Sequence, residues 1–165
     1  MKSPHLLRAA NNVRQLKENL VTVLDPRAID AIETEILANV GQLYSLGRAH
    51  FLFAERQNSR AWRQKISRLY YAAYNVSRAV RLCASGEFST DSSDHRKIEE
   101  LPVDFPKINT YKNKLGLLRE DRNLCDYDHT GKLKDLIASL DESLNLVRDF
   151  LHDAQAYLKG RGVTL

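Results

Sequence analysis

The chain has 165 residues, a mass of 18.9 kDa and a formal net charge of +4, which fits one domain. With 43% hydrophobic and 28% charged residues, it is neither a disordered tail nor a membrane protein by composition. Residues 1–20 mix charges into the apolar positions where a signal peptide needs an unbroken apolar run, and no stretch approaches the roughly 20 apolar residues of a membrane span. We therefore expect a cytoplasmic protein without membrane contacts.

Cysteine, glycine and proline are all scarce. Cys83 and Cys125 are too few for a disulfide scaffold and have no partners at metal-ligand spacing, so we expect them to be reduced residues in or near the core. This predicts no metal site, and no cofactor motif is present. Seven glycines and four prolines disfavour an all-β protein built on many turns, so helix is favoured.

The basic residues are concentrated in one part of the chain. The segment Arg48–Arg81 has eight basic residues against a single acidic one, Glu55, whereas residues 28–47 contain no base. Seven of the eight are arginines, whose planar guanidinium suits bidentate contacts with phosphate. A polyanion is therefore one interpretation, and a solvated helix face balanced by acidic neighbours is the other.

The first half of the chain predicts three helices. Apolar residues at helical spacing predict an N-terminal helical extension within residues 1–24, with the helix itself over about 4–23. Asp25 and Pro26 read as an N-cap followed by proline in the first turn, and start a helix that continues toward Gln57. The pattern restarts near Asn58 or Ser59 and gives a helix whose apolar residues run from Trp62 to Ala84. Gly86 suits the left-handed position that closes it.

The second half predicts a long connection and two further helices. Residues 86–106 are rich in Ser, Asp, Glu and Pro, with one or two helical turns expected over about His95–Leu101. Helical spacing resumes over Tyr111–Cys125, breaks near Thr130 and Gly131, and returns over Leu133–Leu158. The predicted fold is all-α: residues 25–165 form an antiparallel up-and-down four-helix bundle with a long loop between its second and third helices.

Arg122 is a polar residue at a position where the helical pattern predicts contact with other helices. A half-buried arginine needs acceptors, and Asp126 lies four residues later, on the same helix face. His129 follows Arg122 by seven residues, so an uninterrupted helix would place both on one side, with Cα atoms roughly 10 Å apart. One phosphate would then reach both side chains, while a structural ion pair and a helix-end histidine are the alternative interpretation. His50 and His95 are expected to be ordinary surface or packing residues.

Two segments resemble the HEPN domain family. Residues Ile66–Leu82 (ISRLYYAAYNVSRAVRL) are similar to the second-helix pattern of that family, and Arg122–His129 (RNLCDYDH) to its third-helix element, in which an Arg precedes a His by a few positions. The resemblance covers about residues 40–158 in the expected order. It implies a four-helix up-and-down bundle that is usually a homodimer. Many members are metal-independent ribonucleases, often toxins or parts of defence systems, with a neutralising antitoxin that is frequently a nucleotidyltransferase.

The chemistry of RNA cleavage suggests a role in such an activity for each of several side chains. Arg122 would clamp the scissile phosphate, His129 would exchange a proton near neutral pH, and the second subunit's copy of that histidine would take the opposite role. Asn123 would orient the phosphate or His129, Asp126 would fix Arg122, and Tyr127 would stack on a base or pack at the dimer contact. We further expect three arginines to guide the RNA backbone, namely Arg78, Arg81 and Arg119.

Three functions remain open at this point. The first is a HEPN-type endoribonuclease that acts as a homodimer. The second is an accessory module that binds RNA or nucleotides but cleaves nothing, and the third is a helical adaptor for another protein.

Overall fold

The computed structural model describes residues 12–21, 24–89 and 92–165, and these are all-helical. The only β-type pairing among them is an isolated bridge between Asn12 and Glu87. The all-α prediction is therefore confirmed. The α-helices are α2 (Val13–Leu20), α3 (Pro26–Arg56), α4 (Trp62–Ser85), α5 (Ile108–Tyr127) and α6 (Leu140–Lys159), and the 3₁₀ helices are η1 (Ser59–Ala61), η2 (Ser92–Glu99) and η3 (Leu133–Asp135).

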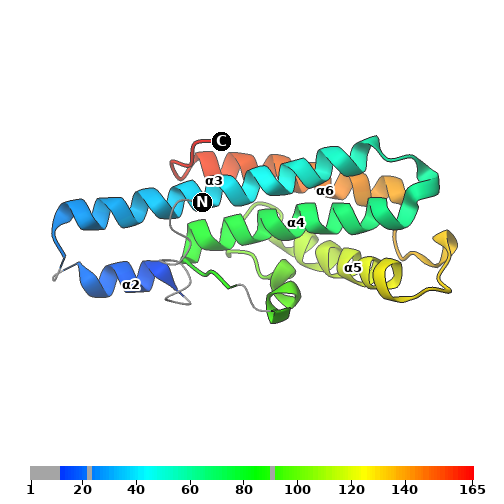
Figure 1. Cartoon of the computed structure of the whole chain (residues 1–165), viewed down its shortest axis with the longest axis horizontal. Coiled ribbons are helices and arrows are strands. Elements are labelled where there is room, and N and C mark those ends of the chain that lie inside the picture. The colour runs from blue at the N-terminus through cyan, green and yellow to red at the C-terminus, as the bar shows by residue number, and fades with distance from the viewer. Residues whose placement is uncertain (1–11, 22–23, 90–91) are drawn as a thin grey trace.

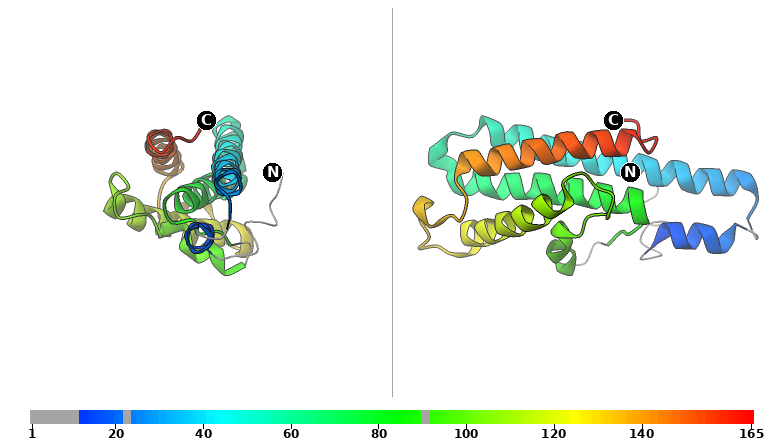
Figure 2. Two further views of the ribbon diagram at one scale, coloured as in Figure 1. Left: turned by 90° about the vertical axis from the view of Figure 1, so that its left-hand side faces the viewer. Right: turned by 180° about the vertical axis from the view of Figure 1, so that it is seen from behind.

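The four long helices α3 to α6 lie alongside one another, and the chain runs in alternating directions through them (Figure 1). Helix α4 packs against α3, α5 and α6. The view along the molecule shows α5 and η2 on one side of α4 and α6 on the other (Figure 2). Helix α4 is accordingly the most buried element, with fifteen buried residues.

Local capping explains where α3 begins and where α4 ends. The Asp25 carboxylate accepts a hydrogen bond of 2.9 Å from the Ala28 amide, with Pro26 as the first helical residue. Gly86 closes α4 in the left-handed conformation with φ +74°, and its amide donates to the Leu82 carbonyl. Both predicted boundaries are confirmed.

Helices α3 and α4 approach closely at Gly47. A Cβ atom at this position would lie 2.6 Å from Val76 Cγ2 and 2.8 Å from the Ala72 carbonyl oxygen. No side chain fits at those distances, so glycine is required for the two helices to pack as they do.

Helix α2 packs on α3 and on the C-terminal end of α4. The Val13 amide donates to the Gly86 carbonyl at 2.9 Å, and Arg14 Nε donates to the Cys83 carbonyl at 2.9 Å. Lys17 forms an ion pair of 2.6 Å with Glu33 of α3. The predicted N-terminal helix is thus present over Val13–Leu20. It begins after Asn12, which is extended and caps it, and ends before Val21, while residues 1–11 and 22–23 of the predicted range lie outside the described part of the chain.

Helix α6 begins later than its apolar pattern predicts. A continuous helix from Leu133 is wrong, because η3 and an extended turn occupy the chain up to Ser139. The buried Asp121 carboxylate accepts hydrogen bonds from the amides of Ile137 (2.7 Å) and Ala138 (3.1 Å), which holds this turn against α5. Ser139 then forms a capping box with Glu142 and starts α6.

In the part of the chain that the structure describes, no helix has the length and apolar character needed to cross a bilayer. The long connection between α4 and α5 contains η2, which agrees with the predicted helical turns near His95.

Candidate functional site: an arginine and tyrosine cleft between α4, α5 and η2

A cleft of about 820 Å³ opens where η2 lies beside α4 and α5. Three elements contribute its lining. Helix α4 supplies Tyr70 and Tyr71, η2 supplies His95 and Arg96, and α5 supplies Arg119, Arg122, Asn123 and Tyr127. The lining therefore combines three guanidinium groups, three tyrosines and a histidine, and it contains no carboxylate.

The Arg122 guanidinium occupies the centre of a polar network in this cleft. Its Nη2 donates to the Tyr71 hydroxyl at 2.9 Å, and its Nη1 donates to the Tyr127 hydroxyl at 3.0 Å and to Asn123 Oδ1 at 3.3 Å. The Asp126 carboxylate lies 2.8 Å from Nε, outside hydrogen-bond geometry, as an ion pair. The predicted pairing of Arg122 with Asp126 is confirmed.

Aromatic rings surround the same guanidinium. Its Cζ lies 5.0 Å from the ring centre of Tyr127, 5.3 Å from Tyr70 and 5.5 Å from Tyr71. These distances are within the range of cation–π attraction, which is stronger where water is partly excluded. The Arg122 side chain is only 11% exposed, so the rings and hydroxyls hold it in one place.

Two N–H groups of Arg122 make no hydrogen bond to the described residues: the buried Nε–H beside Asp126, and one N–H of Nη2. A guanidinium has five N–H groups, and two of them are on Nη2. Among the described residues, only the Tyr71 hydroxyl accepts from Nη2. A phosphate oxygen entering the cleft would meet an arginine that is already held in position and has an N–H to donate.

Two more arginines extend the positive charge along the rim. Arg119 Nη1 forms an ion pair of 2.8 Å with Glu99 and Nη2 one of 3.2 Å with Glu120, while Nη1 also donates to the Arg96 carbonyl. Arg96 is exposed on η2. The predicted surface role of Arg119 is compatible with its place in the cleft, although carboxylates share its charge.

His95 lies in the cleft with Arg122. Its Nδ1 is 2.9 Å from the Tyr70 hydroxyl, and its ring stacks on Tyr74 with 4.3 Å between ring centres. Burial, together with the nearby charge of Arg122, lowers the pKa of His95 below its usual value. The imidazole is therefore neutral at physiological pH.

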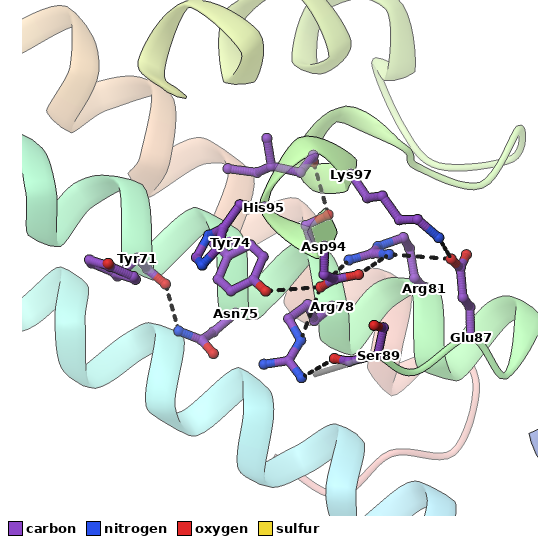
Figure 3. Close-up of polar contacts among 12 residues, drawn as sticks. Tyr71, Tyr74, Asn75, Arg78, Arg81, Glu87, Ser89, Asp94, His95 and Lys97 are labelled. Atoms are coloured by element: carbon purple, nitrogen blue, oxygen red, sulfur yellow. Dashed lines mark hydrogen bonds and ion pairs between the residues drawn. The ribbon is translucent and has the colours of Figure 1, made fainter. Parts of the chain in front are cut away.

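A buried cluster on α4 holds η2 in place (Figure 3). Asp94 is 1% exposed, and it accepts two hydrogen bonds of 3.1 Å from Arg81 and one of 2.9 Å from the Tyr74 hydroxyl. Arg78 Nε lies 3.4 Å away as a second cation. Burial opposes the charge on Asp94, but the hydrogen bonds and charge of Arg81 outweigh it and lower the pKa of the carboxyl.

This cluster corrects two of the predicted RNA contacts. Arg81 is 4% exposed and its guanidinium binds Asp94, so it does not present charge to the surface. Arg78 is half-buried, donates to the Ser89 carbonyl and lies over the rings of Tyr74 and Phe88. Neither arginine lines the cleft, because both carry the structural task of neutralising a buried carboxylate.

His129 is the main correction to the predicted site. Helix α5 ends at Tyr127, so His129 is not two helical turns beyond Arg122 on a continuous helix. It lies exposed in the following turn and is absent from the cleft lining. The reason is Arg63 of α4, whose guanidinium donates to four carbonyl groups at the end of α5 and in the turn, those of Leu124, Cys125, Asp128 and Gly131.

The structure brings together Arg122, Asn123, Asp126 and Tyr127 as predicted. Tyr127 is 71% exposed at the end of α5, so among the described residues its ring is not packed in the core. Prediction from the sequence missed Tyr70, Tyr71, His95 and Arg96 as members of the cleft. The sequence did contain a hint for the two tyrosines: adjacent residues on a helix cannot both face the same core, so one of them had to point elsewhere. It contained no comparable hint that His95 and Arg96 of η2 would join the cleft.

Among residues 12–21, 24–89 and 92–165, no three His, Cys, Asp or Glu side chains are placed to hold a metal ion. No protein-family model, no curated protein and no solved structure matches this chain.

Proposed function

We propose that this protein binds single-stranded RNA, with a backbone phosphate held by Arg122 in the cleft between α4, α5 and η2. The observation that carries the proposal is the immobilised Arg122 guanidinium, which is surrounded by tyrosine rings and retains an N–H donor on Nη2. Positive charge supplies affinity for the backbone, and aromatic rings supply stacking surfaces for bases.

The composition of the cleft favours a single strand over a duplex. Unstacked bases pack on aromatic side chains, whereas a duplex keeps its bases stacked inside. Tyr127 is largely exposed beside Arg122, and its ring is 5.0 Å from the Arg122 Cζ. A base and its neighbouring phosphate would thus find a ring and a cation next to each other.

The proposal is tested by fluorescence anisotropy with a labelled single-stranded RNA. Replacing Arg122 by Gln removes a charge-assisted contact, so we expect affinity to fall by about tenfold or more. Arg122→Lys keeps the charge without the planar fork and should give a smaller loss. Arg27→Gln removes one exposed charge at the N-terminal end of α3 and is the control. Equal affinities for wild type, Arg122→Gln and Arg27→Gln would rule out the cleft as the binding site.

A second candidate function is the metal-independent endoribonuclease activity that the HEPN resemblance implies, together with its four-helix bundle and homodimer. The observation in its favour is a neutral histidine, His95, in the same cleft as Arg122. A neutral imidazole can take the proton of a ribose 2′-hydroxyl. The 2′-oxygen then attacks the adjacent phosphorus, and the bond to the 5′-oxygen breaks to leave a 2′,3′-cyclic phosphate.

The leaving 5′-oxygen requires a proton, and the exposed position of His129 is compatible with delivery from a second copy of the chain in a homodimer. Arg122 would stabilise the charge on the pentacoordinate phosphorus. Under this candidate the protein is a toxin or defence component of the cytoplasm, and its partner is an antitoxin or a nucleotidyltransferase.

Cleavage is tested by incubating labelled RNA with the protein in a chelator and analysing the product ends. We expect cyclic phosphate ends from wild type and a loss of about 100-fold or more for His95→Gln and for His129→Gln. His152→Gln replaces an exposed histidine of α6 and is the matched control. Binding without any cyclic phosphate product would leave the RNA-binding function and remove the nuclease candidate.

A further inference from the structure

Next to the cleft, a row of aromatic and basic side chains continues across α4 to α3. Tyr71 lines the cleft, and its ring centre is 5.8 Å from that of His50 on α3. His50 Nδ1 is 3.2 Å from Arg68 Nη1, and the Arg68 Cζ lies 5.2 Å from the ring centre of Phe53. These contacts connect Phe53 to Arg122 through a continuous series of neighbours.

The outer end of this row is exposed to solvent. Phe53 is 48% exposed on α3, although its neighbours Phe51 and Ala54 are buried in the core. Arg68 is exposed on α4 and contacts His50, and among the described residues it forms no ion pair with an acidic side chain. An exposed ring beside a cation that no carboxylate neutralises suits a ligand that has both a π face and a negative charge.

From these contacts we infer a second nucleotide subsite formed by Phe53, His50 and Arg68, which binds the base and phosphate of a residue farther along the same RNA strand. The subsite rests on the proposed RNA-binding function of the Arg122 cleft. It extends that function by giving the strand a path, from α5 across Tyr71 of α4 to α3. Phe53 offers a stacking surface, and Arg68 offers a phosphate contact.

The inference predicts a dependence on RNA length. A dinucleotide occupies the Arg122 cleft only, whereas an RNA of about 12 nucleotides, within the roughly 4 to 16 nucleotides of single-strand binding sites, reaches both subsites. Phe53→Ala should therefore weaken binding of the longer RNA by about fivefold or more and leave dinucleotide binding unchanged. Arg68→Gln should also reduce the slope of log affinity against log salt for the longer RNA by about 0.7.

Arg27→Gln is the matched control for charge, because it removes one exposed arginine at the other end of α3. Anisotropy measurements with both RNAs on all four proteins decide the question. Suppose that wild type binds both RNAs, and that Phe53→Ala and Arg68→Gln bind the longer RNA as tightly as the control Arg27→Gln. The second subsite is then refuted, and the Arg122 cleft stands. If wild type binds neither RNA, the proposed function fails first. Equal losses for dinucleotide and longer RNA would likewise overturn the subsite, because they would indicate a change in the cleft itself.

Discussion

Arg81 donates two hydrogen bonds of 3.1 Å to the Asp94 carboxylate, and the residue that follows Asp94 is His95. The pair is nearly inaccessible to solvent, so the position of η2 on α4 is determined by a buried ion pair. His95 consequently reaches the cleft through an ion pair whose two residues are not part of the cleft lining. The structure thus separates two kinds of arginine, those that hold the scaffold and those that face the cleft.

Replacing Asp94 by Asn tests this separation. The change leaves the Arg81 guanidinium buried without its carboxylate, so we expect the free energy of unfolding to fall by about 3 kcal/mol. Chemical denaturation followed by circular dichroism measures it. Arg148→Gln is the control, because it breaks an exposed ion pair with Glu55 and should cost less than about 1 kcal/mol. Similar losses from the two variants would contradict the structural role of the Asp94 cluster.

Tyr71→Phe removes one hydroxyl that fixes Arg122. The hydrogen bond from Arg122 Nη2 at 2.9 Å is lost, while the ring that contributes the cation–π contact remains. We expect RNA affinity to fall by a factor of about 3 to 10, with a change in stability below about 1.5 kcal/mol. Anisotropy and denaturation measured on the same preparation separate the two effects. A large loss of stability with unchanged affinity would show that the hydroxyl serves the fold and not the cleft.

Gly86 and Gly162 form a matched pair for testing how α2 is attached. Both have positive φ, +74° and +81°, so alanine is strained at either position by about 1 kcal/mol. A Cβ atom on Gly86 would also lie 2.6 Å from the Arg14 amide nitrogen, whereas one on Gly162 meets nothing within 4 Å. Gly86→Ala should therefore cost about 1 to 3 kcal/mol more than Gly162→Ala. Hydrogen exchange should show faster exchange in α2 for Gly86→Ala alone, and equal behaviour of the two variants would contradict the docking of α2.

The helices were predictable where their signals are local. Asp25 with Pro26 and the glycine at position 86 mark helix ends within one turn of sequence. The start of α6 was not predictable, because it depends on Asp121, which binds the amides of residues 137 and 138 from the preceding helix. An apolar pattern indicates which face is buried, but not whether a distant carboxylate holds the chain in an extended turn.

In the candidate site, too, local contacts were predictable from the sequence and contacts between distant segments were not. The pairing of Arg122 with Asp126 follows from their spacing on one helix and is present. The contact of Arg122 with Tyr71 joins two helices, and the displacement of His129 follows from capping by Arg63, which is more than 60 residues away in sequence. His95 had no signal, since its segment has no apolar period and is positioned by the buried Asp94. Sequence therefore identified the helical core of the site, and tertiary contacts decided which histidine joined it.

The lowered pKa of His95 predicts that acid weakens the fold. In the unfolded chain the imidazole takes up a proton near pH 6.5, whereas burial and the charge of Arg122 resist protonation in the folded state. The free energy of unfolding therefore keeps this contribution in full above about pH 6.5 and loses it as the pH falls toward the lowered pKa of the folded state. The lowered pKa of His50 acts in the same direction.

Between about pH 7.5 and about pH 5.5, the His95→Gln variant should lose less stability than wild type, as measured by denaturation at each pH. His152→Gln, which replaces an exposed histidine, should follow wild type. If the stability of His95→Gln falls with pH as steeply as that of wild type, His95 takes up its proton as readily in the folded protein as in the unfolded chain. That result would remove the neutral imidazole on which the nuclease candidate depends.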